Sequence, residues 1–162
     1  MFEQLTRIQA IFYDFDGVMT DNRVYLSETG LESVACCRGD GLGVSYFKKA
    51  GILQFIISTE TNAVVARRAM KLDIPFYSGA DNKKEVLMRV LASNPEIQLA
   101  NVVFVGNDVN DLGCIECVGV PISPADAEIE VKEKCIWVTR ARGGFGVVRE
   151  LMRLYDRAQE AK

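Results

Sequence analysis

Three short apolar runs, each followed at once by polar or glycine residues, limit the folds open to this chain. They are IQAIFY at residues 8–13, ILQFII at 52–57 and VVFV at 102–105. Apolar runs without alternation are typical of strands that are buried on both faces. Such strands need helices above and below them, as in a parallel α/β sheet. The pattern therefore predicts an α/β fold.

The segments between these runs place apolar residues at helical spacing. Expected helices cover residues 41–50, 62–72, 83–91, 111–117, 126–134 and 147–158, and further short strands cover 74–77, 120–122 and 136–138. Residues 24–26 and 32–37 flank the turn-forming SETG sequence, which favours a β-hairpin. We expect a doubly wound, mainly parallel sheet with helices on both faces. It would form a single domain over residues 1–162, interrupted only by a small hairpin insertion at about 22–38.

Composition argues against several classes of protein. A net charge of −3 over 162 residues gives no electrostatic case for a nucleic-acid or anionic-membrane partner. No apolar run approaches the roughly 18 residues of a membrane span. The N-terminal segment lacks the apolar core of a signal peptide, so we expect a cytoplasmic protein. The five cysteines are odd in number, and Cys114 and Cys117 fall on an expected helix. We therefore expect buried thiols rather than a disulfide framework or a zinc site.

The chain contains no histidine. Every Ser-His-Asp, Cys-His or histidine–metal mechanism is therefore excluded. Catalysis by this chain would have to use carboxylates, lysine, hydroxyl groups, backbone amides and a metal ion.

Polar side chains gather where the three apolar runs end. They are Asp14 and Asp16 after the first run, Ser58 and Thr59 after the second, and Asn107, Asp108 and Asp111 after the third. Because the carboxyl ends of parallel strands meet at one edge of a sheet, we expect all of them to line one crevice. That convergence is a stronger argument than any single motif.

Asp14 and Asp16 are two residues apart, which directs both side chains to one side of an extended segment. Two carboxylates would repel a phosphate, and Mg²⁺, which prefers oxygen ligands, would remove that conflict. One carboxylate could then attack phosphorus while the other acts as acid and base. A pair of turn-capping aspartates explains the bare motif equally well, and a helix N-cap explains residues 107–111 equally well. The expected convergence is what favours a metal site.

Ser58 and Lys83 offer contacts for a phosphate group. Ser58 lies where a hydroxyl and a backbone N–H at a helix start can bind phosphate oxygen. Lys83 and Lys84 begin an expected helix, and one of them could place a cation on the phosphate or keep the nucleophile ionised. Without the surrounding motifs, a solvent-exposed lysine pair is the simpler explanation.

Taken in order, these motifs resemble the haloacid dehalogenase superfamily of phosphatases. The resemblance covers nearly the whole chain, through DFDGVMTD at 14–21, the strand ending at Ser58, Lys83, and GNDVND at 106–111. The chain is more closely similar to the small, capless subgroup of 3-deoxy-octulosonate 8-phosphate phosphatases and nonulosonic acid 9-phosphate phosphatases. The same module forms the C-terminal part of some sialic acid cytidylyltransferases. RGDGLG at 38–43 and GGFGVVRE at 143–150 resemble further segments of that subgroup.

The resemblance implies roles for the residues around the nucleophile. Asp14 would attack phosphorus and form an aspartyl-phosphate. Asp16 would protonate the leaving alcohol and then activate water, and its backbone carbonyl would bind Mg²⁺. Ser58 and Thr59 would bind the phosphoryl group, and Lys83 would neutralise its charge.

The resemblance also implies the remaining metal ligands. Asn107 falls where the family usually has a metal-binding Asp. Its amide oxygen can still coordinate Mg²⁺, but with one negative charge less, so the ion would bind more weakly. Asp111 would support the metal and the lysine, and Asp108 is a less certain contributor.

The substrate expected from the resemblance depends on the residues after Ser58. Octulosonate phosphatases typically carry T-G-R there, whereas nonulosonate-type members carry Glu, with a Lys on the next helix. Glu60 and Lys71 fit the second pattern. A sialic acid-like 9-phosphate is therefore favoured over the 8-phosphate, although an exposed Glu and Lys would look the same in sequence. Arg140 or Arg142 could meet the substrate carboxylate, and Arg142 is the preferred candidate.

Capless members of the subgroup close their sites by forming tetramers through the early hairpin, so the resemblance implies a homotetramer. Two alternatives to a specific sugar-acid phosphatase stay open. One is a weakly active oligomerisation module, and the other is a phosphatase of wider specificity. The presence of Asp14, Asp16, Ser58 and Lys83 favours an active enzyme, while Asn107 leaves room for the module.

Overall fold

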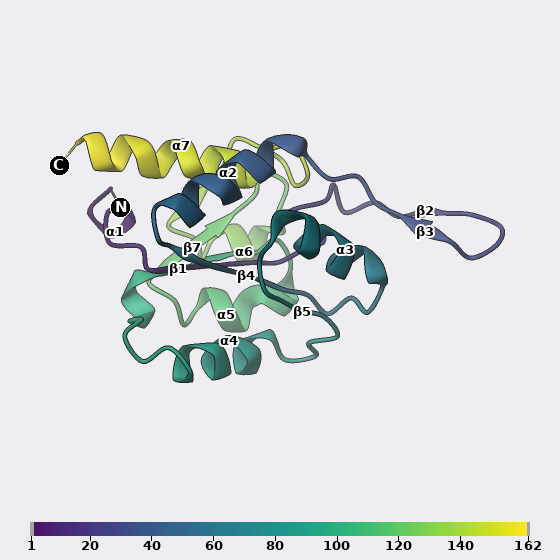
Figure 1. Cartoon of the computed structure of the whole chain (residues 1–162), viewed down its shortest axis with the longest axis horizontal. Coiled ribbons are helices and arrows are strands. Elements are labelled where there is room, and N and C mark those ends of the chain that lie inside the picture. The colour runs from purple at the N-terminus through teal and green to yellow at the C-terminus, as the bar shows by residue number, and fades with distance from the viewer. Residues whose placement is uncertain (1, 162) are drawn as a thin grey trace.

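A computed structural model describes residues 2–161 of the chain as a central parallel sheet with helices on both faces (Figure 1). The sheet has six strands in the order β5-β4-β1-β6-β7-β8. They are β1 Ala10–Tyr13, β4 Leu53–Ile57, β5 Phe76–Tyr77, β6 Val102–Val105, β7 Val120–Ser123 and β8 Trp137–Val138. Every neighbouring pair in this sheet is parallel. The expected α/β fold is confirmed.

Two groups of helices cover the two faces of the sheet. One face packs against α1 Phe2–Leu5, α2 Arg38–Lys49, α3 Ala63–Leu72 and α7 Val147–Glu160, and the other against α4 Lys83–Ala92, α5 Leu112–Ile115 and α6 Ile129–Lys132. Successive residues of a strand point to opposite faces. Ile11 and Tyr13 of β1 therefore belong to the first core, and Phe12, which stacks on Phe55, belongs to the second.

The order of the strands fixes where a ligand can bind. From β1 the chain builds β4 and β5 on one side, and then returns to the other side of β1 to build β6, β7 and β8. This change of direction leaves a crevice beyond the carboxyl ends of the strands on either side of the switch. The polar residues that follow β1, β4 and β6 all lie at this edge.

The hairpin consists of β2 Tyr25–Leu26 and β3 Glu32–Ser33, and it projects from the body of the molecule (Figure 1). The second strand was expected to reach residue 37, and it is shorter. Cys36 forms only an isolated bridge with Thr20, and α2 begins directly afterwards at Arg38. The pairing ends because the chain has to turn back from the hairpin onto the sheet.

Some helix boundaries differ from those expected, for identifiable reasons. Helix α2 begins before residue 41, and Gly43 lets it approach α7, since a Cβ there would lie 2.7 Å from the Val148 carbonyl oxygen. The helix expected at 126–134 covers only α6, because the Asp126 carboxylate accepts hydrogen bonds from the loop at Arg142 and Gly143 instead. The helix expected at 111–117 is a 3₁₀ turn, Val109–Asp111, followed by α5.

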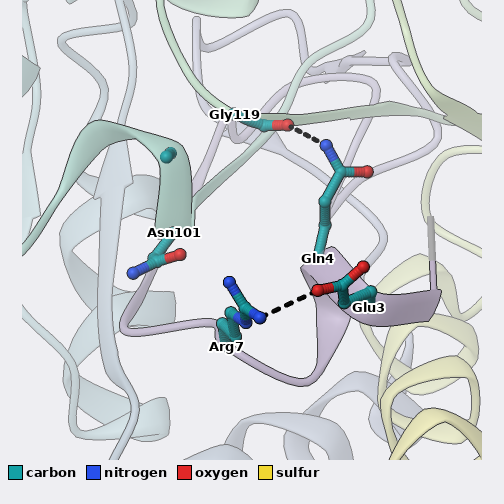
Figure 2. Close-up of a pocket in the computed structure, with 6 residues that line it drawn as sticks. Glu3, Gln4, Arg7, Asn101 and Gly119 are labelled. Carbon is teal, nitrogen blue, oxygen red and sulfur yellow. Dashed lines mark hydrogen bonds and ion pairs between the residues drawn. The ribbon is translucent and has the colours of Figure 1, made fainter.

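Helix α1 was not expected from the sequence. It lies at the amino edge of the sheet, beside a hollow of about 280 Å³ (Figure 2). Figure 2 shows two hydrogen bonds there, from Arg7 to Glu3 and from Gln4 to the Gly119 carbonyl oxygen. The hollow therefore lies at the edge of the sheet opposite the polar clusters. Within residues 2–161, no helix is long and apolar enough to cross a bilayer.

Candidate active site

Asp14 lies directly after β1, in the middle of the sheet. Its backbone N–H donates to the Val105 carbonyl oxygen at 2.9 Å, and its side chain is buried. The register pairs Tyr13 with Ile56 of β4 and with Val105 of β6. Ser58 and Asn107 therefore both lie one position beyond the level of Asp14, on the two neighbouring strands. The sheet brings the three predicted clusters to one edge.

Lys83 forms ion pairs with two carboxylates, those of Asp14 and Asp111. Its Nζ lies 2.7 Å from Oδ1 of Asp14 and 2.7 Å from Oδ1 of Asp111. Lys83 is the first residue of α4, where a positive charge is unfavourable to the helix dipole, and it is only 2% exposed. Two carboxylates at ion-pair distance offset this cost, which favours a functional lysine over a solvated one.

Burial and charge act in opposite directions on these groups. Burial and the charge of Asp111 raise the pKa of Asp14 while Lys83 lowers it, and the balance of these effects is a pKa of about 7. Burial lowers the pKa of Lys83, but the charges and hydrogen bonds of Asp14 and Asp111 outweigh that effect and leave the pKa raised. Lys83 is therefore a permanent cation that favours the ionised form of Asp14.

The raised pKa values predict how the stability of the metal-free protein depends on pH. Burial raises the pKa of Asp40 from 3.8 to about 6, and that of Asp14 from 3.8 to about 7. At a pH between 3.8 and its raised pKa, each carboxyl group is protonated in the folded protein and loses its proton on unfolding. The free energy of unfolding should therefore fall as pH rises from about 4 to about 7. Urea unfolding in EDTA across this interval measures the slope. Asp14→Asn should flatten it, and an unchanged slope in that variant would contradict the assignment.

Asn107 brings together three groups that suit a metal ion. One terminal atom of its carboxamide lies 2.8 Å from the Asp16 carbonyl oxygen and 3.0 Å from Oδ2 of Asp14. Without a cation the favourable atom at this position is the nitrogen, which donates to both oxygens. With a cation bound, the amide oxygen would take this position, 2.8 Å and 3.0 Å from the other two oxygens. Neighbouring ligands of an octahedral Mg²⁺ lie about 3.0 Å apart when each is about 2.1 Å from the ion, so the three groups fit.

This site would use only one carboxylate. In residues 2–161, no group of three or more His, Cys, Asp or Glu side chains is arranged to hold a metal. The candidate ligands are instead the carboxylate of Asp14, the backbone carbonyl of Asp16 and the amide of Asn107. Asp111 would position the Asn107 loop instead of binding the ion, because its Oδ2 accepts the backbone N–H groups of Asn107 at 2.9 Å and Asp108 at 3.3 Å.

Two glycines make room for this arrangement. Gly17 has a φ of +80°, and a Cβ there would lie 2.1 Å from a terminal atom of the Asn107 carboxamide. Gly106 faces Asp111, whose Cβ and Cγ would lie 2.7 Å from an added Cβ. Any side chain at either position would displace a predicted site residue.

Asp16 is half-buried and has the properties of an acid. Thr20 donates to its Oδ1 at 3.3 Å. Burial raises the pKa of Asp16, the hydrogen bond from Thr20 lowers it, and the nearby Glu60 raises it. A raised pKa favours the protonated form needed to donate a proton to a leaving alcohol.

Ser58 and Thr59 lie at the end of β4. Ser58 is buried, its N–H donates to the Tyr77 carbonyl oxygen, and its Oγ accepts the N–H of Glu60 at 3.0 Å. The Ser58 O–H is thus left to donate to a ligand. Thr59 is exposed at the same edge.

Glu60 and Lys71, expected to act together on the substrate, lie at opposite ends of α3. The Glu60 carboxylate accepts the N–H groups of Thr61 at 2.7 Å and Asn62 at 2.8 Å, in the turn just before the helix. Lys71 is exposed in the last turn, about 12 Å along the helix axis from Ala63. Within one chain the structure does not bring the two side chains together.

The two arginine candidates point to different places. The Arg142 Nε donates to Oδ2 of Asp126 at 3.2 Å, on a loop whose Gly144 N–H donates to the Val18 carbonyl oxygen next to the catalytic segment. Arg140 instead lines a separate pocket with Trp137. The loop that carries Arg142 therefore lies beside residues 14–21, and a contact between Arg142 and the substrate stays a prediction.

Two further residues were not singled out from the sequence. Thr20 is buried, and its Oγ1 accepts the N–H groups of Gly17 and Asn22 while it donates to Asp16, so it holds the loop that follows β1. Glu32 of β3 accepts a hydrogen bond from Asn62 at 2.7 Å, which ties the hairpin to the start of α3. Only the DGVMT spacing could have indicated Thr20, and nothing local to the sequence indicates Glu32.

Comparison with known proteins agrees with this geometry. No family model matches the chain. A curated relative, the 3-deoxy-D-manno-octulosonate 8-phosphate phosphatase KdsC of Escherichia coli K12, is 34% identical over 156 residues, covering 94% of this chain and 81% of the relative. The chain belongs to the KdsC family of haloacid dehalogenase (HAD) phosphatases.

Solved structures of related proteins are also similar to this KdsC-family chain. A HAD family hydrolase from Streptomyces avermitilis is 42% identical, with a TM-score of 0.88 and coverage of 91% of this chain and 84% of that one. The 3-deoxy-D-manno-octulosonate 8-phosphate phosphatase of Moraxella catarrhalis, in complex with a magnesium ion, a phosphate ion and a KDO molecule, is 29% identical. Its TM-score is 0.92, with coverage of 98% of this chain and 91% of that one. The expected superfamily and capless fold are confirmed.

Proposed function

We propose that this chain is a Mg²⁺-dependent phosphatase that hydrolyses the phosphate monoester of a 2-keto-3-deoxy sugar acid through an aspartyl-phosphate on Asp14. The observation that carries the proposal is the buried Asp14 carboxylate. One of its oxygens contacts Lys83 at 2.7 Å, and the other lies 3.0 Å from the Asn107 amide. A carboxylate held between a fixed cation and a metal-type set of ligands suits attack on phosphorus.

The proposed reaction uses side chains already in place. A carboxylate oxygen of Asp14 attacks phosphorus, and the bond from phosphorus to the substrate oxygen breaks. Asp16 donates its proton to the leaving alcohol, then accepts a proton from the water that hydrolyses the aspartyl-phosphate. Ser58 donates to a phosphoryl oxygen. Lys83 stays cationic throughout and offsets the charge around Asp14.

Mg²⁺ would be held by Asp14, the Asp16 carbonyl and Asn107. Asp111 would position Asn107 by accepting its backbone N–H. When bound, the ion supplies charge stabilisation for the phosphoryl oxygens. The remaining ligands of such an ion are usually water and the substrate phosphate.

The substrate we propose first is the 8-phosphate of a 3-deoxy-octulosonate. The KdsC relative at 34% identity carries that substrate in its name, and the Moraxella structure contains KDO. The nonulosonic acid 9-phosphate expected from Glu60 and Lys71 stays a second candidate. Its support is weaker because the Glu60 carboxylate is hydrogen-bonded to the turn before α3 and Lys71 lies at the far end of that helix.

Phosphate release from the two sugar-acid phosphates, compared by kcat/KM, tests this proposal. We expect Mg²⁺-dependent turnover of both and a preference for the 8-phosphate. Glu60→Gln and Lys71→Gln should change the ratio of the two kcat/KM values by less than about threefold if neither residue selects the substrate. No turnover of either compound would instead support the oligomerisation module.

Asn107→Asp tests the metal site separately. The added carboxylate should lower the Mg²⁺ concentration at half-maximal activity by about tenfold, because Mg²⁺ prefers charged oxygen ligands. In EDTA the same variant should melt at a lower temperature than the parent, since another buried negative charge would face Asp14. Magnesium titrations of activity and melts with and without Mg²⁺ provide both measurements. An unchanged magnesium requirement would argue against Asn107 as a ligand.

We also propose a homotetramer assembled through the hairpin. Its apolar side chains are unusually exposed for a single chain, with Leu26 at 68% and Leu31 at 69%. An exposed apolar strand edge of this kind usually pairs with another chain. Sedimentation velocity should give a tetramer for the parent and smaller species for Leu26→Asp/Leu31→Asp. A monomeric parent would contradict this assembly.

A further inference from the structure

A second pocket lies between β8 and α7, outside the candidate active site. It has a volume of about 360 Å³ and is lined by Trp137, Arg140, Glu150, Arg153, Leu154 and Arg157. Arg153 and Arg157 are four residues apart on α7 and therefore share one face of the helix. Arg140 follows β8 and reaches the same space from the sheet. Three guanidinium groups thus come from two separate elements to one pocket.

These three arginines have no ion-pair partner among the residues that the structure describes. The ion pairs there involve Arg7, Lys48, Lys83, Lys134 and Arg142 instead. Glu150 is the only acid lining the pocket, and its two carboxylate oxygens accept the backbone N–H groups of Arg140 at 2.9 Å and Ala141 at 2.8 Å. In a chain with a net charge of −3, the pocket therefore concentrates positive charge. Unpaired like charges repel one another, and an anion would relieve that repulsion.

Trp137 adds an aromatic ring to the lining. Its indole N–H is buried and has no acceptor in residues 2–161. Together with Leu154 it gives the pocket an apolar wall beside the arginines. The lining therefore offers hydrogen-bond donors and an aromatic surface, while the oxygens of its one acid are already in use.

We propose that this pocket binds a small phosphorylated molecule through its phosphate group. Guanidinium groups match phosphate oxygens with paired N–H donors, and several of them favour a dianion over a single carboxylate. The volume lies at the lower end of the range for small-molecule sites, so a metabolite fits better than a macromolecule. The catalytic Asp14, Asp16 and Lys83 do not line this pocket.

The chain provides its own probe for the test, because Trp137 is its only tryptophan. Its fluorescence is followed while inorganic phosphate, pyrophosphate or gluconate is added in EDTA at constant ionic strength. We expect a saturable change with phosphate and pyrophosphate, and a weaker response or none with the carboxylate. A response to gluconate as strong as that to pyrophosphate would overturn the choice of phosphate. The absence of any saturable response would overturn the site.

Arg153→Gln/Arg157→Gln identifies where the anion binds, with Arg67→Gln on α3 as the matched control. Arg67, Arg153 and Arg157 are exposed on helices, and glutamine is a good helix former. The double variant and the control should therefore both fold. The double variant should bind pyrophosphate at least about tenfold more weakly, because it loses two of the three guanidinium groups that would hold the anion. The control should bind as the parent does. Equal affinity in parent and double variant would place the anion elsewhere and overturn the proposal.

Discussion

Replacing Asp14 by asparagine should lower kcat by about a thousandfold or more and leave the fold intact. The amide has nearly the same shape as the carboxylate, so packing beside β1 is kept. It is a poor nucleophile, however, and it brings no negative charge to a metal. Because Asp14 is only 4% exposed and contacts both Lys83 and Asn107, no neighbouring carboxylate can take its place.

Phosphate release measured with Asp81→Asn as control separates chemistry from a general loss of charge. Asp81 is an exposed aspartate just before α4 and forms no side-chain hydrogen bond or ion pair within residues 2–161. The control should keep the parent's activity, and circular dichroism should show both variants folded. A folded Asp14→Asn protein with more than about a tenth of the parent's kcat would mean that another group attacks phosphorus.

Lys83→Met should both inactivate the protein and destabilise it, by about 3–5 kcal/mol. The methionine side chain fills similar space, but Asp14 and Asp111 lose the cation that lies 2.7 Å from each. Two buried carboxylates would then face each other without compensation, which also pushes the pKa of Asp14 further upward. Urea unfolding in EDTA measures the loss of stability, and phosphate release measures the loss of activity.

A second substitution shows whether charge is the cause. Lys83→Met/Asp111→Asn removes one of the two uncompensated carboxylates, and the new amide can still accept the backbone N–H groups of Asn107 and Asp108. The double variant should therefore be more stable than Lys83→Met while remaining inactive. If it is less stable by the sum of the two single losses, the network would be held by packing rather than by charge.

The sequence was most informative where position along a strand determines position in space. Asp14, Ser58 and Asn107 each follow an apolar run, and parallel pairing alone brings such residues to one edge. Lys83 could be proposed only because it begins a helix on the chain between two of these strands. The sheet and the candidate active site were predictable for the same reason.

Side-chain direction was not predictable in the same way. Glu60 and Lys71 matched a sequence pattern, but the Glu60 carboxylate is hydrogen-bonded to the turn before the helix that separates them. Arg140 and Arg142 are two residues apart, but the Arg142 side chain donates to Asp126. Arg140 instead lines the pocket beside Trp137, and its backbone N–H donates to Glu150. These outcomes depend on hydrogen bonds between distant segments, which local spacing does not record.

The central claim is that Asp14 becomes phosphorylated. Its most direct test is to mix the protein with Mg²⁺ and the sugar-acid 8-phosphate, quench in acid within the first turnover, and analyse peptides by mass spectrometry. The account predicts one added phosphoryl group on the peptide that contains Asp14, absent when Mg²⁺ is omitted and absent in Asp14→Asn. Turnover without any phosphorylated peptide, or with the phosphoryl group on another residue, would contradict it.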